Sequence, residues 1–245
     1  MKSRFLFFWI FSFILWDASG FAGQKIAVTG QMSGYLAMPE NPAEKIPAIL
    51  LIHEWWGLND QIKGLADEFA SNGFAALAVD LYRGDATDDP MKAHELMRGL
   101  PDGRVIRDLK SAMDFLQKNP SIDSKKIGVI GWCMGGGYAL SFALEDSRVQ
   151  ALVMYYGKLV TDNKKLEPLK APLLGFFGEE DRGIPPDTVK DFEYRLNQLG
   201  KRAEIHLVPN AGHAFANPNN KEGYRPEAAK DAWQKTLIFF KSNLI

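Results

Sequence analysis

The chain contains a single cysteine among its 245 residues. This excludes an intramolecular disulfide and any metal site built from several cysteines. An excess of charge of one sign is also lacking, because 29 Lys and Arg residues stand against 30 Asp and Glu residues, for a net charge of −1. That balance argues against a nucleic-acid-binding protein, which needs a basic surface to neutralise phosphates.

A hydrophobic run long enough to span a bilayer is missing at the N-terminus. The apolar segment 5–16 is shorter than the ~20 residues that a membrane-spanning helix needs. Basic residues precede it and small residues follow it, which is the layout of a secretory signal peptide. We therefore predict that residues 1–22 are a cleaved signal peptide and that the protein is periplasmic or secreted, with no stable membrane anchor after cleavage. Cleavage after Gly20 and cleavage after Ala22 fit this layout equally well. The alternative to a cleaved signal peptide is an uncleaved membrane anchor or a buried N-terminal helix.

Residues 23–245 are expected to form a single domain, because they contain no repeat, low-complexity tract or long linker. Short apolar runs rich in branched residues indicate buried strands, and they alternate with amphipathic stretches that indicate helices. The expected strands are 48–52, 75–79, 127–130, 149–155, 173–177 and 203–208. The expected helices are 62–72, 105–119, 134–144, 186–199 and 226–240. This alternation predicts an α/β fold with a mostly parallel central sheet and helices on both faces.

The single cysteine lies in a glycine-rich turn directly after an expected strand. Residues 131–137 read Gly-Trp-Cys-Met-Gly-Gly-Gly, a G-x-C-x-G pattern. This is the nucleophile elbow of α/β hydrolases, with cysteine in the serine position. The flanking glycines leave room where strand and helix nearly touch, and a helix N-terminus favours a thiolate. We predict that Cys133 is a nucleophile; the alternative is a small buried residue beside a helix-packing site.

A thiol nucleophile requires a base, and the base requires an orienting acid. Of the four histidines in the chain, His213 is favoured because it lies in a loop just past strand 203–208, at the edge where open α/β sheets place their sites. His53, His94 and His206 are the alternatives.

The orienting acid is expected in the loop after strand 173–177, which contains Glu179, Glu180 and Asp181. Asp181 is favoured because it lies farthest along the loop, and the two glutamates remain alternatives, as does a solvated acidic loop without a catalytic role. The order nucleophile, acid, histidine along the chain is that of α/β hydrolases. Together these positions predict a Cys133, Asp181 and His213 triad.

Residues 53–57, His-Glu-Trp-Trp-Gly, follow the first buried strand. A zinc-binding helix is excluded because residue 57 is not a second histidine, and we predict no metal site. Such folds supply a second oxyanion donor at this place, so the backbone N–H groups of Trp55 and Met134 are assigned to an oxyanion hole. Glu54 is expected to project beside the thiol, with a solvated loop charge as the alternative.

Four further side chains are candidates for substrate binding: Tyr82, Arg83, Trp56 and Trp132. The first two follow strand 75–79, which brings them toward the same edge of the sheet. An arginine there is suited to holding a substrate carboxylate; its alternative is a surface salt bridge. The alternative for Trp56, as for Trp55, is an ordinary core or surface aromatic.

From about Gly34 to Phe240 the chain resembles the dienelactone hydrolase family of the α/β-hydrolase superfamily. The matching segments are 53–57, 80–82, 131–136, 178–181 and 212–215. The resemblance implies the triad named above, with Glu54 interacting with the resting thiol. It also implies hydrolysis of a cyclic enol-lactone or a related ester, the carboxymethylenebutenolidase reaction, with no metal or organic cofactor.

Two positions depart from the family pattern. The family's type enzyme has a carboxylate-binding arginine four residues after the histidine, where this chain has Asn217. A second arginine usually follows Asp-Leu-Tyr after one intervening residue, whereas Arg83 follows Tyr82 directly. Together with the expected export, these departures point away from dienelactone itself as the substrate.

The sequence thus predicts a hydrolase that cleaves a small-molecule lactone or small ester through a cysteine nucleophile. A carboxylate near a thiol disfavours the thiolate, so Glu54 is expected to keep the resting Cys133 neutral. The alternatives are a carboxylesterase or peptidase-like hydrolase of other specificity, and a non-catalytic ligand-binding or redox-thiol protein on the same fold. No oligomeric state is favoured.

Overall fold

An eight-stranded sheet forms the centre of the structure, a computed structural model that describes residues 23–40, 42 and 44–245. The strands lie in the order β1-β2-β4-β3-β5-β6-β7-β8. The neighbours from β4 to β8 are parallel, whereas β1 and β2 join one edge in antiparallel pairings. The bounds are β1 Gln24–Ala27, β2 Ser33–Ala37, β3 Ile46–Ile52, β4 Ala75–Val79, β5 Ile122–Trp132, β6 Ala151–Tyr155, β7 Leu173–Gly178 and β8 Ala203–Val208.

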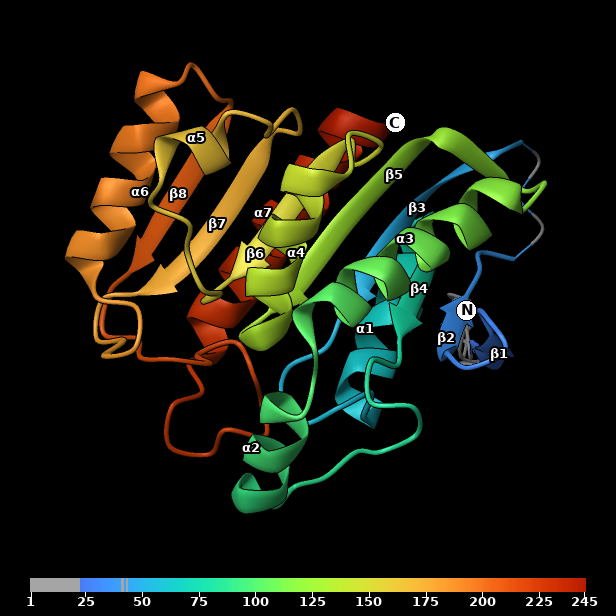
Figure 1. The fold of residues 1–245 in the computed structure, drawn as a ribbon, viewed down its shortest axis with the longest axis horizontal. Coiled ribbons are helices and arrows are strands. Elements are labelled where there is room, and N and C mark those ends of the chain that lie inside the picture. The colour runs from blue at the N-terminus through green and yellow to red at the C-terminus, as the bar shows by residue number, and fades with distance from the viewer. Residues whose placement is uncertain (1–22, 41, 43) are drawn as a thin grey trace, which may run out of the picture.

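Helices cover both faces of the sheet, as Figure 1 shows. Apolar residues of α3, α4 and α6 share one buried cluster with the sheet, and those of α1 and α7 share the cluster on the opposite face. The bounds are α1 Asp60–Ser71, α2 Pro90–Arg98, α3 Asp102–Lys118, α4 Met134–Glu145, α5 Asn163–Leu166, α6 Pro186–Gln198 and α7 Pro226–Leu244. The sheet is therefore the middle of three layers, buried on both sides along its parallel part.

Sequence periodicity predicted this architecture, and the structure confirms the α/β fold with its mostly parallel sheet. The antiparallel edge was not predicted. β1 is short and mostly exposed, so it carries no apolar run, and β2 reads Ser-Gly-Tyr-Leu-Ala. The strand expected at 127–130 is part of the longer β5, whose first half is polar and partly exposed.

The parallel strands end at a common edge, and the loops that follow them carry the residues singled out in the sequence. Helix α2 lies beyond this edge and away from the layers, at the bottom of Figure 1. Its N-terminus is defined by Asp89, whose side chain accepts a hydrogen bond from the Met91 N–H, and by Pro90 in the first turn. This edge is therefore where a site is expected.

Within the described residues, none of the helices combines the length and the hydrophobicity needed to cross a bilayer. The signal peptide expected at residues 1–22 lies outside the described residues.

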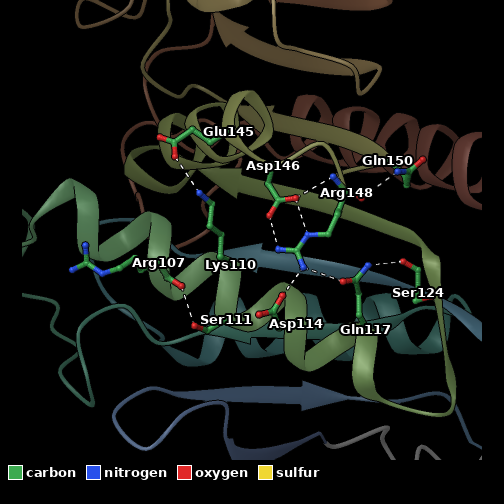
Figure 2. A network of polar contacts seen from close by, with 10 residues as sticks. All are labelled: Arg107, Lys110, Ser111, Asp114, Gln117, Ser124, Glu145, Asp146, Arg148 and Gln150. Carbon is green, nitrogen blue, oxygen red and sulfur yellow. Dashed lines mark hydrogen bonds and ion pairs between the residues drawn. The ribbon is translucent and has the colours of Figure 1, made fainter.

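At the amino end of β6, on the side of the sheet away from the site, Arg148 joins the turn before this strand to helix α3 (Figure 2). Its guanidinium donates to both carboxylate oxygens of Asp146, at 2.8 and 2.6 Å, and to Asp114 and Gln117 on α3. Gln117 in turn donates to the Ser124 carbonyl at 3.0 Å. Because Asp146 is largely buried, this network is expected to contribute to stability more than an exposed ion pair does.

Replacing Arg148 by methionine is therefore expected to lower the free energy of unfolding by about 1–3 kcal/mol, since Asp146 keeps its burial and loses its cation. Urea unfolding measures this loss. Lys110→Met removes a more exposed pair with Glu145 and serves as the control, with an expected change within about 0.5 kcal/mol. Equal losses in the two variants would contradict the role given to Arg148.

Candidate active site

Cys133 lies at the turn between β5 and α4, with a backbone conformation that few residues adopt. Its φ is 54° and its ψ is −118°. Such a conformation costs about 1–3 kcal/mol and persists only where the surroundings impose it. Here the Cys133 N–H donates to the Tyr155 carbonyl at 3.0 Å, and the Cys133 carbonyl accepts from the Gly136 and Gly137 amides. The strained turn therefore holds the thiol at the carboxyl edge of the sheet.

The glycines of the turn are required because backbone segments touch there. A Cβ on Gly131 would overlap the backbone of Gly135. A Cβ on Gly135 would overlap the carbonyl of Ile52 and lie 2.5 Å from that of His53. These contacts are the physical reason for the G-x-C-x-G spacing, since any side chain at either position would push strand and helix apart.

The structure brings the three expected residues into one line of hydrogen bonds. His213 Nε2 lies 3.1 Å from Cys133 Sγ, and His213 Nδ1 lies 2.7 Å from Asp181 Oδ2. Asp181 comes from the loop after β7 and His213 from the loop after β8. Three distant parts of the chain thus meet at the carboxyl ends of the strands, where the site was expected.

The loop after β7 also decides between the three acidic candidates. The side chain of Asp181 is only 1% exposed, and its Oδ1 accepts from the amides of Gly183 and Ile184 at 2.8 and 3.1 Å. Glu179 and Glu180 are exposed. The Asp181 carboxylate is therefore the one oriented toward the imidazole.

The pKa values of His213 and Asp181 follow from the hydrogen bond between their side chains. Burial lowers the pKa of His213, but the hydrogen bonds to Asp181 and Cys133 outweigh it and raise the pKa to about 10. Burial raises the pKa of Asp181, whereas the bond to His213 and the two loop amides lower it to a net value below its usual range. The site therefore favours an imidazolium between a carboxylate and the thiol sulfur.

The other three histidines lie in different surroundings. His53 is fully buried, with Nδ1 2.5 Å from the Glu54 carbonyl and Nε2 3.3 Å from the Leu81 N–H, and burial lowers its pKa. His206 pairs with Glu204 and stacks on Phe176. His94 is on α2. His213 is the histidine that reaches Cys133.

The two backbone groups assigned to an oxyanion hole are free to donate. Met134 is the first residue of α4, so its N–H has no partner within the helix. Among the described residues we find no acceptor for the Met134 N–H or for the Trp55 N–H. Both residues flank the thiol, Met134 through the chain and Trp55 through the pocket wall described next.

A pocket of about 740 Å³ opens beside the thiol. One wall comes from the loop after β3 and the segment around α2, and the other from the loop after β8. The lining residues are Glu54, Trp55, Trp56, Asn59, Thr87, Asp88, Met97, Cys133, His213, Ala214, Asn217, Asn219, Asn220, Lys221 and Glu222. This volume suits a small organic molecule.

Of the four candidates for substrate binding, only Trp56 lines this pocket. Tyr82 is buried behind it, with its ring against His53 and its hydroxyl 3.4 Å from Met134 Sδ. Trp132 is 3% exposed and packs on Tyr155 in the core cluster under α1 and α7.

Arg83 also lies outside the pocket lining. Its Nη2 lies 2.8 Å from both carboxylate oxygens of Asp108 on α3. Its backbone φ is 65°, in the turn that follows β4. The expectation that Arg83 holds a substrate carboxylate is therefore corrected, and its ion-pair alternative describes its place. The expectations for Tyr82 and Trp132 are corrected as well, because both side chains are buried in the core and lie outside the pocket lining.

Glu54 is buried at the pocket floor, and its partner is Asn217 rather than the thiol. Asn217 Nδ2 donates to Glu54 Oε2, while Glu54 Oε1 has no hydrogen-bond partner among the described residues. Burial raises the pKa of Glu54 to about 7, against the opposing bond from Asn217. Any influence of Glu54 on Cys133 therefore acts through space.

Tyr156 is a residue of this site that sequence reasoning missed. It directly follows β6, has a φ of 37°, and packs its buried ring edge-on against His213 at 5.2 Å between ring centres. Burial and the neighbouring Glu54 carboxylate raise its pKa well above the usual range. Its position just after an apolar strand is the signal that would have found it.

A cysteine on a strand-to-helix elbow, at the carboxyl edge of a mostly parallel sheet covered on both faces, defines an α/β hydrolase. Comparison with known families makes this more specific. The dienelactone hydrolase family model matches residues 32–244, and the chain belongs to this family. It is accordingly a dienelactone hydrolase-like hydrolase.

Individual relatives agree with this assignment. A protein of Methylorubrum extorquens assigned as a carboxymethylenebutenolidase is 32% identical over 242 residues, covering 92% of this chain and 82% of the relative. A crystal structure from Klebsiella pneumoniae, assigned as a dienelactone hydrolase, has a TM-score of 0.81 at 30% identity, covering 89% of this chain and 98% of that one. The dienelactone hydrolase of Anabaena variabilis has a TM-score of 0.68 at 25% identity over 91% of this chain and 97% of its own.

Proposed function

We propose that the protein hydrolyses a lactone or small carboxylic ester through a covalent thioester on Cys133. The observation that carries the proposal is the continuous contact from Cys133 Sγ through the His213 ring to Asp181, at the floor of the pocket. A nucleophile, a base and an orienting acid in hydrogen-bond reach are what acyl transfer requires.

The reaction begins with attack of the Cys133 thiolate on the ester carbonyl, with the thiol proton held on His213. The Trp55 and Met134 amides stabilise the negative oxygen of the tetrahedral intermediate. As the carbon–oxygen bond breaks, His213 gives its proton to the leaving oxygen; for a lactone this alcohol stays attached to the acyl group. His213 then takes a proton from water, which attacks the thioester and releases the carboxylic acid and the thiol. Asp181 holds the tautomer and stabilises the imidazolium.

The experiment that tests the proposal is mass spectrometry of the full chain quenched during turnover of p-nitrophenyl acetate. We expect an adduct of one acetyl group on the peptide that contains Cys133. Turnover without this adduct, with acetyl found elsewhere, would refute the covalent mechanism. Absence of both turnover and adduct across an ester and lactone panel would favour the non-catalytic thiol protein, and turnover of peptides alone would favour a peptidase.

Replacing Glu54 by glutamine is expected to speed the alkylation of Cys133 by iodoacetamide. The pKa of about 7 means that Glu54 is neutral below this pH and charged above it. Its charge disfavours the thiolate, so the variant and the wild type should react at similar rates near pH 5.5 and differ by about 3- to 10-fold near pH 8.5. Glu180→Gln, on the exposed part of the loop after β7, is the control. Equal rates for Glu54→Gln and wild type at both pH values would remove the assigned role.

We also propose, from the layout of the first 22 residues, that the chain is exported and processed. N-terminal sequencing of the protein recovered from its native cell tests this; a start at Met1 would contradict it.

A further inference from the structure

The charges on the pocket wall are mostly negative. Glu54, Asp88 and Glu222 contribute carboxyl groups, while Lys221 is the one Lys or Arg that the described residues place in the lining. The imidazolium favoured at His213 faces the Asp181 carboxylate, which offsets its charge. Even with Glu54 protonated, the carboxylates of Asp88 and Glu222 stand against the one ammonium of Lys221.

No guanidinium lines the described pocket, either from Arg83 or at position 217. Arg83 is held by Asp108 outside the lining. Position 217 is an asparagine whose amide N–H donates to Glu54 and whose carbonyl oxygen accepts from the Asn219 amide. Both the amide N–H and the carbonyl oxygen of this side chain are therefore already hydrogen-bonded within the protein.

What the pocket offers instead is apolar surface and neutral donors. Trp55 and Trp56 pack edge-on at 4.8 Å between ring centres, and Met97 of α2 lines the same pocket. The side-chain amide of Asn219 makes no hydrogen bond with the described residues, although Asn219 lines the wall. These groups suit an uncharged acyl chain with a neutral polar substituent.

Building on the proposed function, we propose that this pocket selects uncharged esters and lactones and rejects substrates that carry a carboxylate on the acyl side. Asp88 and Glu222 are exposed, so a carboxylate placed beside them meets a net repulsion that salt can screen. The described lining contains no guanidinium to offset the loss of hydration. We expect kcat/KM for an anionic substrate to be lower than for its neutral counterpart by about tenfold or more at low salt.

The test compares p-nitrophenyl hydrogen adipate with its methyl ester, which differ only in the free carboxylate. We expect the methyl ester to be preferred by about tenfold, with the preference shrinking in 0.5 M NaCl as the charges are screened. The Asp88→Asn/Glu222→Gln double variant should lose most of the preference by gaining activity on the anionic ester. Glu227→Gln, at an exposed position on α7 outside the lining, is the control and should keep it.

The outcomes separate this inference from the proposed function. Hydrolysis of neither ester would contradict the proposed function. Hydrolysis of both with equal or greater kcat/KM for the anionic one would overturn the charge selection and leave the cysteine mechanism standing. A preference that persists unchanged in the double variant and in high salt would also overturn it, since the discrimination would then be steric.

Discussion

Replacing Cys133 by alanine is expected to lower kcat for ester hydrolysis by about 10⁴-fold or more. Sγ forms the covalent bond in the proposed mechanism, and the chain holds no second cysteine. The Trp55 and Met134 amides still polarise a bound carbonyl in this variant, so a residual rate above that of water is expected. Steady-state kinetics with p-nitrophenyl acetate, together with loss of the acetyl adduct, measure the effect.

The Cys133→Ala variant should fold like the wild type. Alanine removes only the sulfur, and the positive φ at position 133 remains a strained conformation for either residue. A thermal midpoint within a few degrees of the wild type would show that the loss is chemical. Retained activity would exclude Cys133 as the nucleophile, whatever the stability.

Replacing Asp181 by asparagine is expected to lower kcat/KM by about 10²- to 10⁴-fold near pH 7. The asparagine keeps the shape, but it can donate to His213 Nδ1 and so favours the wrong tautomer. It also removes the charge that helps to raise the pKa of His213 to about 10. The imidazolium is then lost at lower pH, and the thiolate must form without its positive neighbour. Activity should consequently recover in part as the pH rises above 8, giving a rate profile displaced to alkaline pH.

Glu180→Gln is the matched control for Asp181→Asn. It lies one residue earlier in the same loop and is exposed, so its kcat/KM and pH profile should match those of the wild type. If Asp181→Asn lowered the thermal midpoint without displacing the pH profile, Asp181 would be a structural residue of the loop, tied to the Gly183 and Ile184 amides, and not the orienting acid.

Sequence patterns were sufficient to predict a structural feature where the contacts that determine the feature join residues close together in the chain. The elbow is an example at Gly131, which is required by its contact with Gly135 four residues later; Gly135 is required by a distant contact, with the end of β3. The parallel strands are another, because burial on both faces leaves continuous apolar runs. The edge strands β1 and β2 were missed for the same reason, since an exposed edge imposes no such run.

The directions of side chains at the strand ends were harder to predict. Arg83, Tyr82 and Trp132 all follow or end strands at the correct edge, yet each lies outside the pocket lining. Arg83 does so because an acid 25 positions later, Asp108 on α3, lies within reach. Glu54 and Asn217 meet although 163 positions separate them. Periodicity contains no information about such partners.

By itself, the sequence determined the order of the parallel strands and of the long helices, the family and the reactive groups at the ends of the strands. Hydrophobic periodicity and the glycine spacing around Cys133 encode these features locally. Only the tertiary structure decided which of those groups share the pocket, and hence its charge. That outcome depends on packing between distant segments, which placed Asn217 on Glu54 and Arg83 on Asp108 and left the wall predominantly acidic around a lone cysteine.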